Sequence, residues 1–368
     1  MKYRLKPTKA QATQLDSQLE ECRWTYNHLL AQRRDAWEGQ QESLSYYAQA
    51  TTLPQLKEER PALTGVHSQV LQNVAVRIDL AFKAFFRRCK AGEKPGYPRF
   101  RGYGRYDSMT FPQYGNGCFM ADGMLKLSKI GAVRVIEHRP LEGTPKTCAV
   151  RRSSTGKWYV TITCEVDAQP LPSTGDAVGI DVGLINFTTL STGESTPCPK
   201  FFRQDEHDLK RTQRKLSAAE KGTPERAKRR KIVGRVHERI ANRRSNFVHQ
   251  ESRRIVNRFD VIAVEDLSVN QMVHNHCLAK SIQDAAWSQF ATFLSYKAAC
   301  AGRVFVAINP AYTSQDCSGC GHRQKKTLAE RVHSCTCCGL TLDRDHNAAL
   351  NIKSLGLQAL GFPRSPGV

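Results

Sequence analysis

Long apolar segments are missing from this sequence, and so is the regular cysteine spacing of a disulfide-rich protein. No apolar run approaches the roughly 20 residues that a helix needs to span a bilayer, so we expect no membrane partner. The first residues, MKYRLKPTKAQ, lack the apolar core of a secretory signal. Only four of the 13 cysteines stand in regularly spaced pairs, which argues against a disulfide framework. We therefore expect a reducing, cytoplasmic compartment.

Acidic residues are scarce beside basic ones, which indicates a polyanionic partner. The 368 residues hold 55 Lys and Arg against 34 Asp and Glu, a formal net charge of +21. A chain of this length can form two or three domains with sizeable cores. The excess of positive charge predicts nucleic acid as the partner. A basic protein without such a partner is the alternative.

More than half of this excess lies in residues 200–258, which hold 19 Lys and Arg against 7 Asp and Glu. The basic residues recur at steps of three or four, and Gly222, Thr223 and Pro224 interrupt the run, so the segment predicts a hairpin of two long helices. A merely solvated face is the alternative, but charge this dense and of one sign predicts contact with a phosphate backbone. We assign the contact to Lys210, Arg214, Lys228, Lys231, Arg235, Arg239 and Arg243.

Two Cys-x-x-Cys pairs predict a zinc ribbon over residues 313–340. Each pair supplies two of the four tetrahedral ligands of a structural Zn²⁺, and four thiolates leave no position open for chemistry. The glycine after each pair, Gly321 and Gly339, suits the positive φ of such a turn. Cys337 lies inside the second pair and is an alternative ligand. The expected ligands are Cys317, Cys320, Cys335 and Cys338.

Two segments with helical periodicity stand near the start of the chain. Apolar residues recur at helical spacing in residues 11–38 and 66–90, which predicts a small helical domain. The next segment, residues 94–108, is rich in Gly, Pro, aromatic and basic residues and is typical of a loop. Its Arg99 and Arg101 stand beside Tyr and Phe and suit phosphate contact and base stacking. An ordinary linker is the alternative.

Short segments with strand character then predict a small β-barrel, which ends at a domain boundary in residues 167–175. Turn-forming residues separate these segments, and residues 158–165 alternate between two faces. A further short strand at residues 2–6 is stopped by Pro7. The strands expected after the loop are residues 108–112, 118–120, 125–127, 133–137, 147–152 and 158–165.

The C-terminal half predicts buried apolar strands, two of which end in acidic residues. Asp181 follows one strand, and Glu265 and Asp266 follow another. The last helix begins near Asp343, and the Gly- and Pro-rich tail at 357–368 is expected to fray. The other expected elements are strands at 177–180, 186–190, 261–264 and 303–308 and one helix at 278–303.

These carboxylates indicate a two-metal nuclease centre. Two divalent ions about 4 Å apart can clamp the attacking and leaving oxygens of a phosphodiester, and Mg²⁺ prefers carboxylate oxygens. The order strand Asp, strand Glu, helix Asp predicts Asp181, Glu265 and Asp345 as catalytic residues and ligands of two Mg²⁺ ions, which Mn²⁺ could replace. Asp181 as a turn residue and Asp266 in place of Glu265 are alternatives. Asp343 could be a turn or cap residue, which leaves Asp345 as the ligand.

Several short motifs stand along the chain. They are GIDVG (179–183), VEDL (264–267), LAKSI (278–282), TSQDCSGCG (313–321) and CTCCGLTLDRDHNAALNI (335–352). By these motifs the chain resembles the transposon-encoded TnpB proteins, compact relatives of the type V CRISPR effector nucleases, along essentially its whole length. Weaker matches are RLKPTKAQ (4–11) and PGYPRFR (95–101).

The resemblance implies an α+β multidomain fold with a split barrel. A wedge-type β-barrel is interrupted by a helical recognition domain and followed by a RuvC-type, RNase H-like α/β nuclease domain with an inserted zinc ribbon. The implied ranges are 1–7 and 94–170 for the barrel, 8–93 for the helical domain, 176–312 and 341–356 for the nuclease, 313–340 for the ribbon and 357–368 for a flexible tail.

The resemblance also implies RNA-guided cleavage of double-stranded DNA, with the three acids as catalytic residues. A guide RNA derived from the transposon end would pair with the target strand while the protein reads a short flanking motif, and the protein would be nucleoid-associated. The helix around residues 67–73 is similar to one that contacts this motif in relatives. Ser68, Gln69 and Gln72 share a face there, and Gln can bond adenine edges. Exposed polar residues without that role are the alternative.

Two other functions fit the same scaffold. A catalytically silent, RNA-guided DNA-binding regulator would not need three mutually repelling carboxylates, and all three are present. A strand-transferring transposase would use the same metals with a DNA hydroxyl as nucleophile. The large basic hairpin fits a bound structured RNA better than this second alternative.

Overall fold

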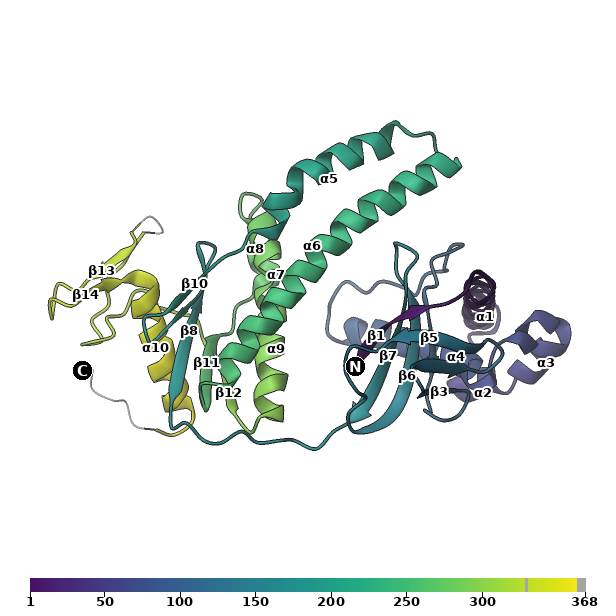
Figure 1. The fold of residues 1–368 in the computed structure, drawn as a ribbon, viewed down its shortest axis with the longest axis horizontal. Coiled ribbons are helices and arrows are strands. Elements are labelled where there is room, and N and C mark those ends of the chain that lie inside the picture. The colour runs from purple at the N-terminus through teal and green to yellow at the C-terminus, as the bar shows by residue number, and fades with distance from the viewer. Residues whose placement is uncertain (328–329, 363–368) are drawn as a thin grey trace. The chain divides into compact units, whose positions relative to one another are not determined.

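Two compact units make up the chain, Met1–Val166 and Asp167–Val368. The computed structural model describes residues 1–327 and 330–362 (Figure 1). Each unit has its own β-sheet and its own apolar core. The division falls where the segment DAQPLPSTG begins.

A seven-stranded antiparallel sheet is the centre of the first unit, in the order β2-β6-β7-β1-β5-β4-β3. Val160 and Ile162 of β7 are fully buried while Thr161 between them is exposed. The six strands expected after residue 107 are confirmed, with ends that differ by at most three residues. The strands are β1 (Lys2–Lys6), β2 (Ser108–Phe111), β3 (Cys118–Ala121), β4 (Met124–Leu127), β5 (Gly131–Ile136), β6 (Thr144–Arg152) and β7 (Trp158–Glu165).

Strand β1 joins the helices of this unit to its sheet. It pairs with β5 on one side and β7 on the other. Its Tyr3 and Leu5 share one apolar core with Leu15 and Ile78 of the helices. The helical residues are therefore an insertion between β1 and the rest of the sheet.

The helices of the first unit include both long helices expected from the sequence. Helix α1 begins with a capping box, in which Thr8 and Gln11 exchange side-chain bonds with each other's backbone N–H. The short helices between α1 and α4 were not predicted, because their few apolar residues are too short a series to show periodicity. The helices are α1 (Lys9–Gln40), α2 (Tyr46–Ala50), α3 (Leu53–Glu59), the 3₁₀ helix η1 (Pro61–Gly65) and α4 (Ser68–Lys90).

A five-stranded mixed sheet is the centre of the second unit, in the order β10-β9-β8-β11-β12. Strand β11 pairs in parallel with β8 and β12, whereas β9 returns antiparallel to β8. The strands expected from the sequence are thus confirmed, but the expectation that residues 303–308 form a core strand is wrong, because β12 lies at the edge of the sheet and only its Ile308 is buried. The strands are β8 (Ala177–Val182), β9 (Asn186–Leu190), β10 (Ser195–Pro197), β11 (Val261–Glu265) and β12 (Val304–Ile308), with β13 (Val332–Ser334) and β14 (Thr341–Asp343) as a separate hairpin.

Helices cover both faces of this sheet (Figure 1). On one face, Val178 and Ile180 pack with residues of α6 and α9, including Ile255 and Leu294. On the other face, Ile352 of α10 packs with β11 and β12. The helices are α5 (Phe201–Ala218), α6 (Pro224–Val256), α7 (Val269–Met272), α8 (Ala279–Ala285), α9 (Trp287–Cys300) and α10 (Arg344–Ala359).

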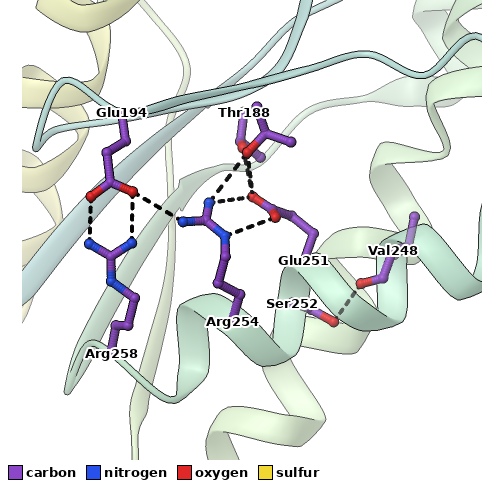
Figure 2. A network of polar contacts seen from close by, with 8 residues as sticks. Thr188, Glu194, Val248, Glu251, Ser252, Arg254 and Arg258 are labelled. Atoms are coloured by element: carbon purple, nitrogen blue, oxygen red, sulfur yellow. Dashed lines mark hydrogen bonds and ion pairs between the residues drawn. The ribbon is translucent and has the colours of Figure 1, made fainter.

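The predicted basic hairpin is confirmed as α5 and α6, and Thr223 caps the second helix. Ion pairs fasten the C-terminal part of α6 to the β9–β10 hairpin (Figure 2). Buried Glu251 accepts bonds from Thr188 and Arg254, while Glu194 accepts from Arg254 and Arg258. The sheet therefore anchors one end of the basic hairpin.

Two expectations about helices are wrong. Residues 278–303 do not form one helix, because Ala286 has φ 58° and ends α8 before α9 begins. Helix α10 continues to Ala359, so residues 357–359 of the expected frayed tail are helical. Residues 363–368 lie outside the described residues.

Across the described ranges, 1–327 and 330–362, no helix combines the length and the apolar character that crossing a membrane requires.

Candidate active site

Parallel pairing brings the first two predicted acids to the same edge of the sheet. Ile180 of β8 lies opposite Val264 of β11. The residues that follow, Asp181 and Glu265, therefore stand side by side at the carboxyl ends of adjacent strands, where open α/β sheets place their ligands.

Helix α10 brings Asp345 to the same edge because its backbone lies directly against β8. A Cβ on Gly179 would come within 2.1 Å of the carbonyl oxygen of Ala349 and 2.3 Å of the amide nitrogen of Lys353. Glycine is the one residue type without a Cβ, so the sequence permits this close approach. Asp345 stands one turn before Ala349, in the first turn of the helix.

The charges of Glu265 and Asp345 act on Asp181, but among the described residues the three carboxylates are not a set whose oxygens all lie within 4.8 Å of one another. Burial, and then the charges of Glu265 and Asp345, raise the pKa of Asp181 to about 8. Burial also raises the pKa of Glu265, while a hydrogen bond from the Thr313 hydroxyl opposes that rise. Burial and neighbouring acids therefore disfavour the ionised carboxylates here, and a bound cation would stabilise them.

The neighbouring acids have other positions. Asp343 is the N-cap of α10, and its carboxylate accepts bonds from the backbone N–H groups of Asp345 and His346. Asp266 is exposed, and its N–H donates to the carbonyl of Ile308. The cap alternative for Asp343 is confirmed, and the geometry favours Glu265 over Asp266.

Sequence reasoning missed one cation at this site. Arg344 donates from Nε and one terminal nitrogen to a single carboxylate oxygen of Asp345, at 3.2 and 3.0 Å. It also donates to the carbonyl of Glu330. In the sequence Arg344 stands between Asp343 and Asp345, and this position could have indicated a cation at the site.

The four predicted cysteines form a cluster that fits a zinc ion. Among the described residues, they are the one set of at least three possible ligands with donor atoms all within 4.8 Å of one another. Two sulfur–sulfur distances are 3.6 and 3.5 Å, close to the roughly 3.8 Å that tetrahedral ligands at Zn–S distances of about 2.3 Å require. Backbone N–H groups of Cys338 and Cys337 lower the pKa of Cys335 to about 6, which favours a thiolate.

The two Cys-x-x-Cys turns, called knuckles below, have the backbone that was expected at their glycines. Gly321 and Gly339 have φ 76° and 75°, the left-handed backbone that glycine tolerates. Cys337 is exposed and lies outside the four-cysteine set. The geometry therefore favours Cys338 over Cys337 as the fourth ligand.

The residues expected to read a flanking motif lie at the start of α4, but two of them have protein partners. The hydroxyl of Ser68 accepts from Lys57 at 2.8 Å, and the amide of Gln69 donates to Gln113 at 2.6 Å. Gln72 is exposed. Gln72 is thus the residue of this set most available to a ligand.

The loop at residues 94–108 is held against α1 and is more than a free linker. Asn27 bonds both the N–H and the carbonyl of Arg101, and the Arg101 guanidinium lies over the ring of Tyr26. Arg99 is exposed. The aromatic residues Tyr97 and Phe100 are about half exposed, so this loop presents both charge and ring faces.

The seven basic residues predicted on the hairpin fall into two groups. Arg239 and Arg243 both donate to buried Asp205, at 2.5 and 3.3 Å, so they join α6 to α5. The other five are exposed, as Arg239 and Arg243 are, but none of the five bonds a buried acid among the described residues. Those five are Lys210, Arg214, Lys228, Lys231 and Arg235.

Family profiles match three segments of the chain. Residues 161–276 match a family described as "Probable transposase", residues 287–352 match "Cas12f1-like, TNB domain", and residues 1–42 match "Helix-turn-helix domain". In the structure, residues 1–42 form strand β1 followed by the single helix α1. The second match covers the zinc cluster and Asp345.

Similar proteins extend over nearly the whole chain. A "Putative RNA-guided DNA endonuclease" of Streptomyces pristinaespiralis is 38% identical over 366 residues, covering 97% of this chain and 89% of that protein. The "Putative RNA-guided DNA endonuclease InsQ" of Escherichia coli (strain K12) is 30% identical over 374 residues, covering 96% of this chain and 91% of that protein.

A solved structure shares the fold. A cryo-EM structure of the Cas12f1–sgRNA–target DNA complex matches with a TM-score of 0.58 and 15% identity, covering 92% of this chain and 82% of that chain. The protein thus has a Cas12f-like α+β fold with a TNB domain. With relatives of 38% and 30% identity along nearly its full length, the chain belongs to the TnpB family.

Proposed function

We propose that this chain is a transposon-associated, RNA-guided endonuclease that cleaves double-stranded DNA in a reaction dependent on divalent metal. The observation that carries the proposal is the convergence of Asp181, Glu265 and Asp345 at one sheet edge, with the pKa of Asp181 raised to about 8. Relatives that match nearly the whole chain, named "Putative RNA-guided DNA endonuclease" and "Putative RNA-guided DNA endonuclease InsQ", support the same function.

In this proposal the three carboxylates hold two Mg²⁺ ions, for which Mn²⁺ can substitute. Oxygen ligands fit such hard cations, and the mutual repulsion of the carboxylates supplies a reason to bind them. When bound, the ions would supply charge stabilisation for the attacking and leaving oxygens of a phosphodiester. The sheet would position the carboxylates of Asp181 and Glu265, and helix α10 would position the carboxylate of Asp345.

The proposed nucleic-acid partners are a guide RNA derived from the transposon end and target DNA that carries a short flanking motif. The exposed residues Lys210, Arg214, Lys228, Lys231 and Arg235 would contact phosphates along α5 and α6, because each neutralised phosphate releases a counterion. On the first unit, Arg99 and Arg101 would contact nucleic acid. Ser68, Gln69 and Gln72 are the candidates for reading the flanking motif, with Gln72 the least engaged.

The proposed domain layout follows the resemblance to this family. It has a wedge-type barrel with an inserted helical domain, then a RuvC-type nuclease domain with a zinc ribbon. The four cysteines would hold one structural Zn²⁺ and take no part in cleavage, because four thiolates leave no ligand position open. The ribbon, residues 313–340, would be followed directly by the nuclease segment 341–356, which holds Asp345.

A plasmid-library experiment tests this function. The protein is co-expressed with RNA from its own locus and given targets with randomised flanks in Mg²⁺, beside an Asp181→Ala control. Guide-dependent cutting that selects a flanking motif and is lost in the control is expected. Guide-dependent binding without cutting would indicate the silent regulator, and joined strands would indicate a transposase.

A further inference from the structure

We propose that Thr313 is a positioning residue for Glu265, held in place by Asn351 of helix α10. The inference rests on the proposed function, since it assumes that Glu265 binds a divalent cation. Thr313 lies in the segment that leads from β12 to the first cysteine pair, 48 residues from Glu265 in sequence. Hydrogen bonds among buried groups carry the inference.

The first contact joins Thr313 to the carboxylate. Its hydroxyl is 2.5 Å from Oε1 of Glu265 and 3.2 Å from the carbonyl oxygen of Pro310. The hydroxyl has a single proton, and the shorter distance assigns it to the carboxylate. Bonds from O–H to a charged oxygen fall at about 2.5–2.7 Å and are roughly twice as strong as neutral ones. Thr313 is 4% exposed, so water does not easily replace it.

The second set of contacts fixes the backbone of Thr313. Buried Asn351 donates to the carbonyl of Thr313 at 2.8 Å and to that of Asp316 at 2.7 Å. Tyr312, immediately before Thr313, has φ 66°. A bulky residue seldom adopts this left-handed backbone, and such strain persists only where surrounding contacts hold it.

The same helix holds the first zinc knuckle. Asn347, which is fully buried, donates to the carbonyl of Asp316 at 2.8 Å and accepts from the N–H of Ser318 at 2.9 Å. Cys317 lies between these two residues. One face of α10 therefore positions Thr313 and the knuckle, while the first turn of α10 supplies Asp345.

The function of this arrangement is to hold one oxygen of Glu265 so that the other is free for a cation. Mutating a residue that hydrogen-bonds a metal ligand typically lowers metal affinity or activity by about ten- to hundredfold. Thr313→Val keeps the shape of the side chain and removes the donor, whereas Thr313→Ser keeps the donor. The hydroxyl, and not the volume, is expected to matter.

The experiment measures metal binding as well as cleavage. Full-length, zinc-loaded protein is heated in rising Mn²⁺, and the Mn²⁺ concentration that gives half of the stabilisation is recorded. The Mg²⁺ dependence of cleavage is measured on the protein–RNA complex. Thr313→Val is expected to raise both midpoints about ten- to hundredfold, and Thr313→Ser to stay within about threefold of the original protein.

Thr188→Val is the matched control, because Thr188 also donates to a buried glutamate, Glu251 at 3.0 Å, in the same unit (Figure 2). This variant is expected to lower the unfolding temperature without changing either metal midpoint. Unchanged midpoints in Thr313→Val would overturn the proposal. Equal losses in Thr313→Ser, or a shift as large in Thr188→Val, would overturn it too, because the hydroxyl at Glu265 would not be the cause.

Glu265→Gln separates this inference from the proposed function. If the unaltered protein cleaves and Glu265→Gln does not, the endonuclease function stands whatever Thr313→Val does. If the unaltered protein neither cleaves nor is stabilised by Mn²⁺, the endonuclease function and the positioning role both fail.

Discussion

Replacing Gly179 with alanine tests how the site is assembled. Gly179 lies in β8, two residues before Asp181, where the backbone of α10 crosses the strand. The added Cβ would lie 2.1 Å from the carbonyl oxygen of Ala349, 2.3 Å from the amide nitrogen of Lys353 and 2.9 Å from its Cα. All three atoms belong to the helix backbone, so no side-chain rotation relieves the contact.

The size of the effect follows from these distances. Non-bonded heavy atoms are comfortable at about 3.5–4.0 Å, so a contact of 2.1 Å requires α10 to retreat from β8 by about 1.4 Å or more. Overpacking of a well-packed core costs about 1–3 kcal/mol and occasionally more. Since the contacts are with backbone, we expect Gly179→Ala to lower the free energy of unfolding of the second unit by about 3 kcal/mol.

Activity should fall further than stability alone would cause. Asp345 and Asn351 both move with α10, and a misplacement of about 1 Å can cost about 100-fold in rate. We therefore expect Gly179→Ala protein that remains folded to cleave at least about 100-fold more slowly in saturating Mg²⁺.

Amide hydrogen exchange of β8 and α10 measures the stability of this unit, and cleavage of a matched DNA target measures the rate. Gly39→Ala is the control, because a Cβ there would have nothing within 4 Å and alanine is the better helix former. Normal exchange protection and normal cleavage in Gly179→Ala would refute the account of how α10 is seated.

Three further predictions concern charge and metal. The pKa of Asp181 is raised to about 8 in the metal-free fold from 3.8, so metal-free protein should lose stability as pH rises from about 4 through about 8. Asp181→Asn should remove most of that loss in unfolding measured at pH 5 and pH 8, and an unchanged pH dependence would contradict it. Cys335→Ser should release the bound zinc and make the ribbon sensitive to protease, as metal analysis and digestion would report; full zinc occupancy would exclude its role as ligand. Changing Lys228, Lys231 and Arg235 to alanine should weaken RNA binding. The slope of the logarithm of the binding constant against the logarithm of the salt concentration should fall by up to about 3. Arg239→Ala should instead mainly destabilise the hairpin, because it removes one of the two arginine partners of buried Asp205. An unchanged slope in the triple variant would show that this face does not bind phosphate.

The places of Asp181 and Glu265 near strand ends, and of Asp343 as a helix cap, could be predicted because they depend on local patterns. An apolar run that ends in Asp181 or Glu265 marks a strand end, and strands of one sheet can bring such ends together. Asp343 stands where a cap residue is expected, which left Asp345 for the site. The cysteine spacing likewise located the cluster without any knowledge of the fold.

Other features could not be predicted, because they depend on which segments meet in space. Nothing near Thr313 in sequence indicates that its hydroxyl faces Glu265, and nothing near Gly179 indicates a helix backbone against it. The pairing of Arg239 with Asp205 likewise required the hairpin to close. Ala286 has no intrinsic preference for the left-handed backbone that separates α8 from α9, so its break could not be read from composition.

Cleavage by the purified protein–RNA complex tests the central claim most directly. Labelled DNA that matches the guide and carries the selected flank is incubated with Mg²⁺, beside DNA that does not match and beside Asp181→Ala protein that retains guide-dependent binding. The account predicts cleavage of the matched DNA alone, and none by the variant. Cleavage that ignores the guide, or that survives Asp181→Ala, would contradict it.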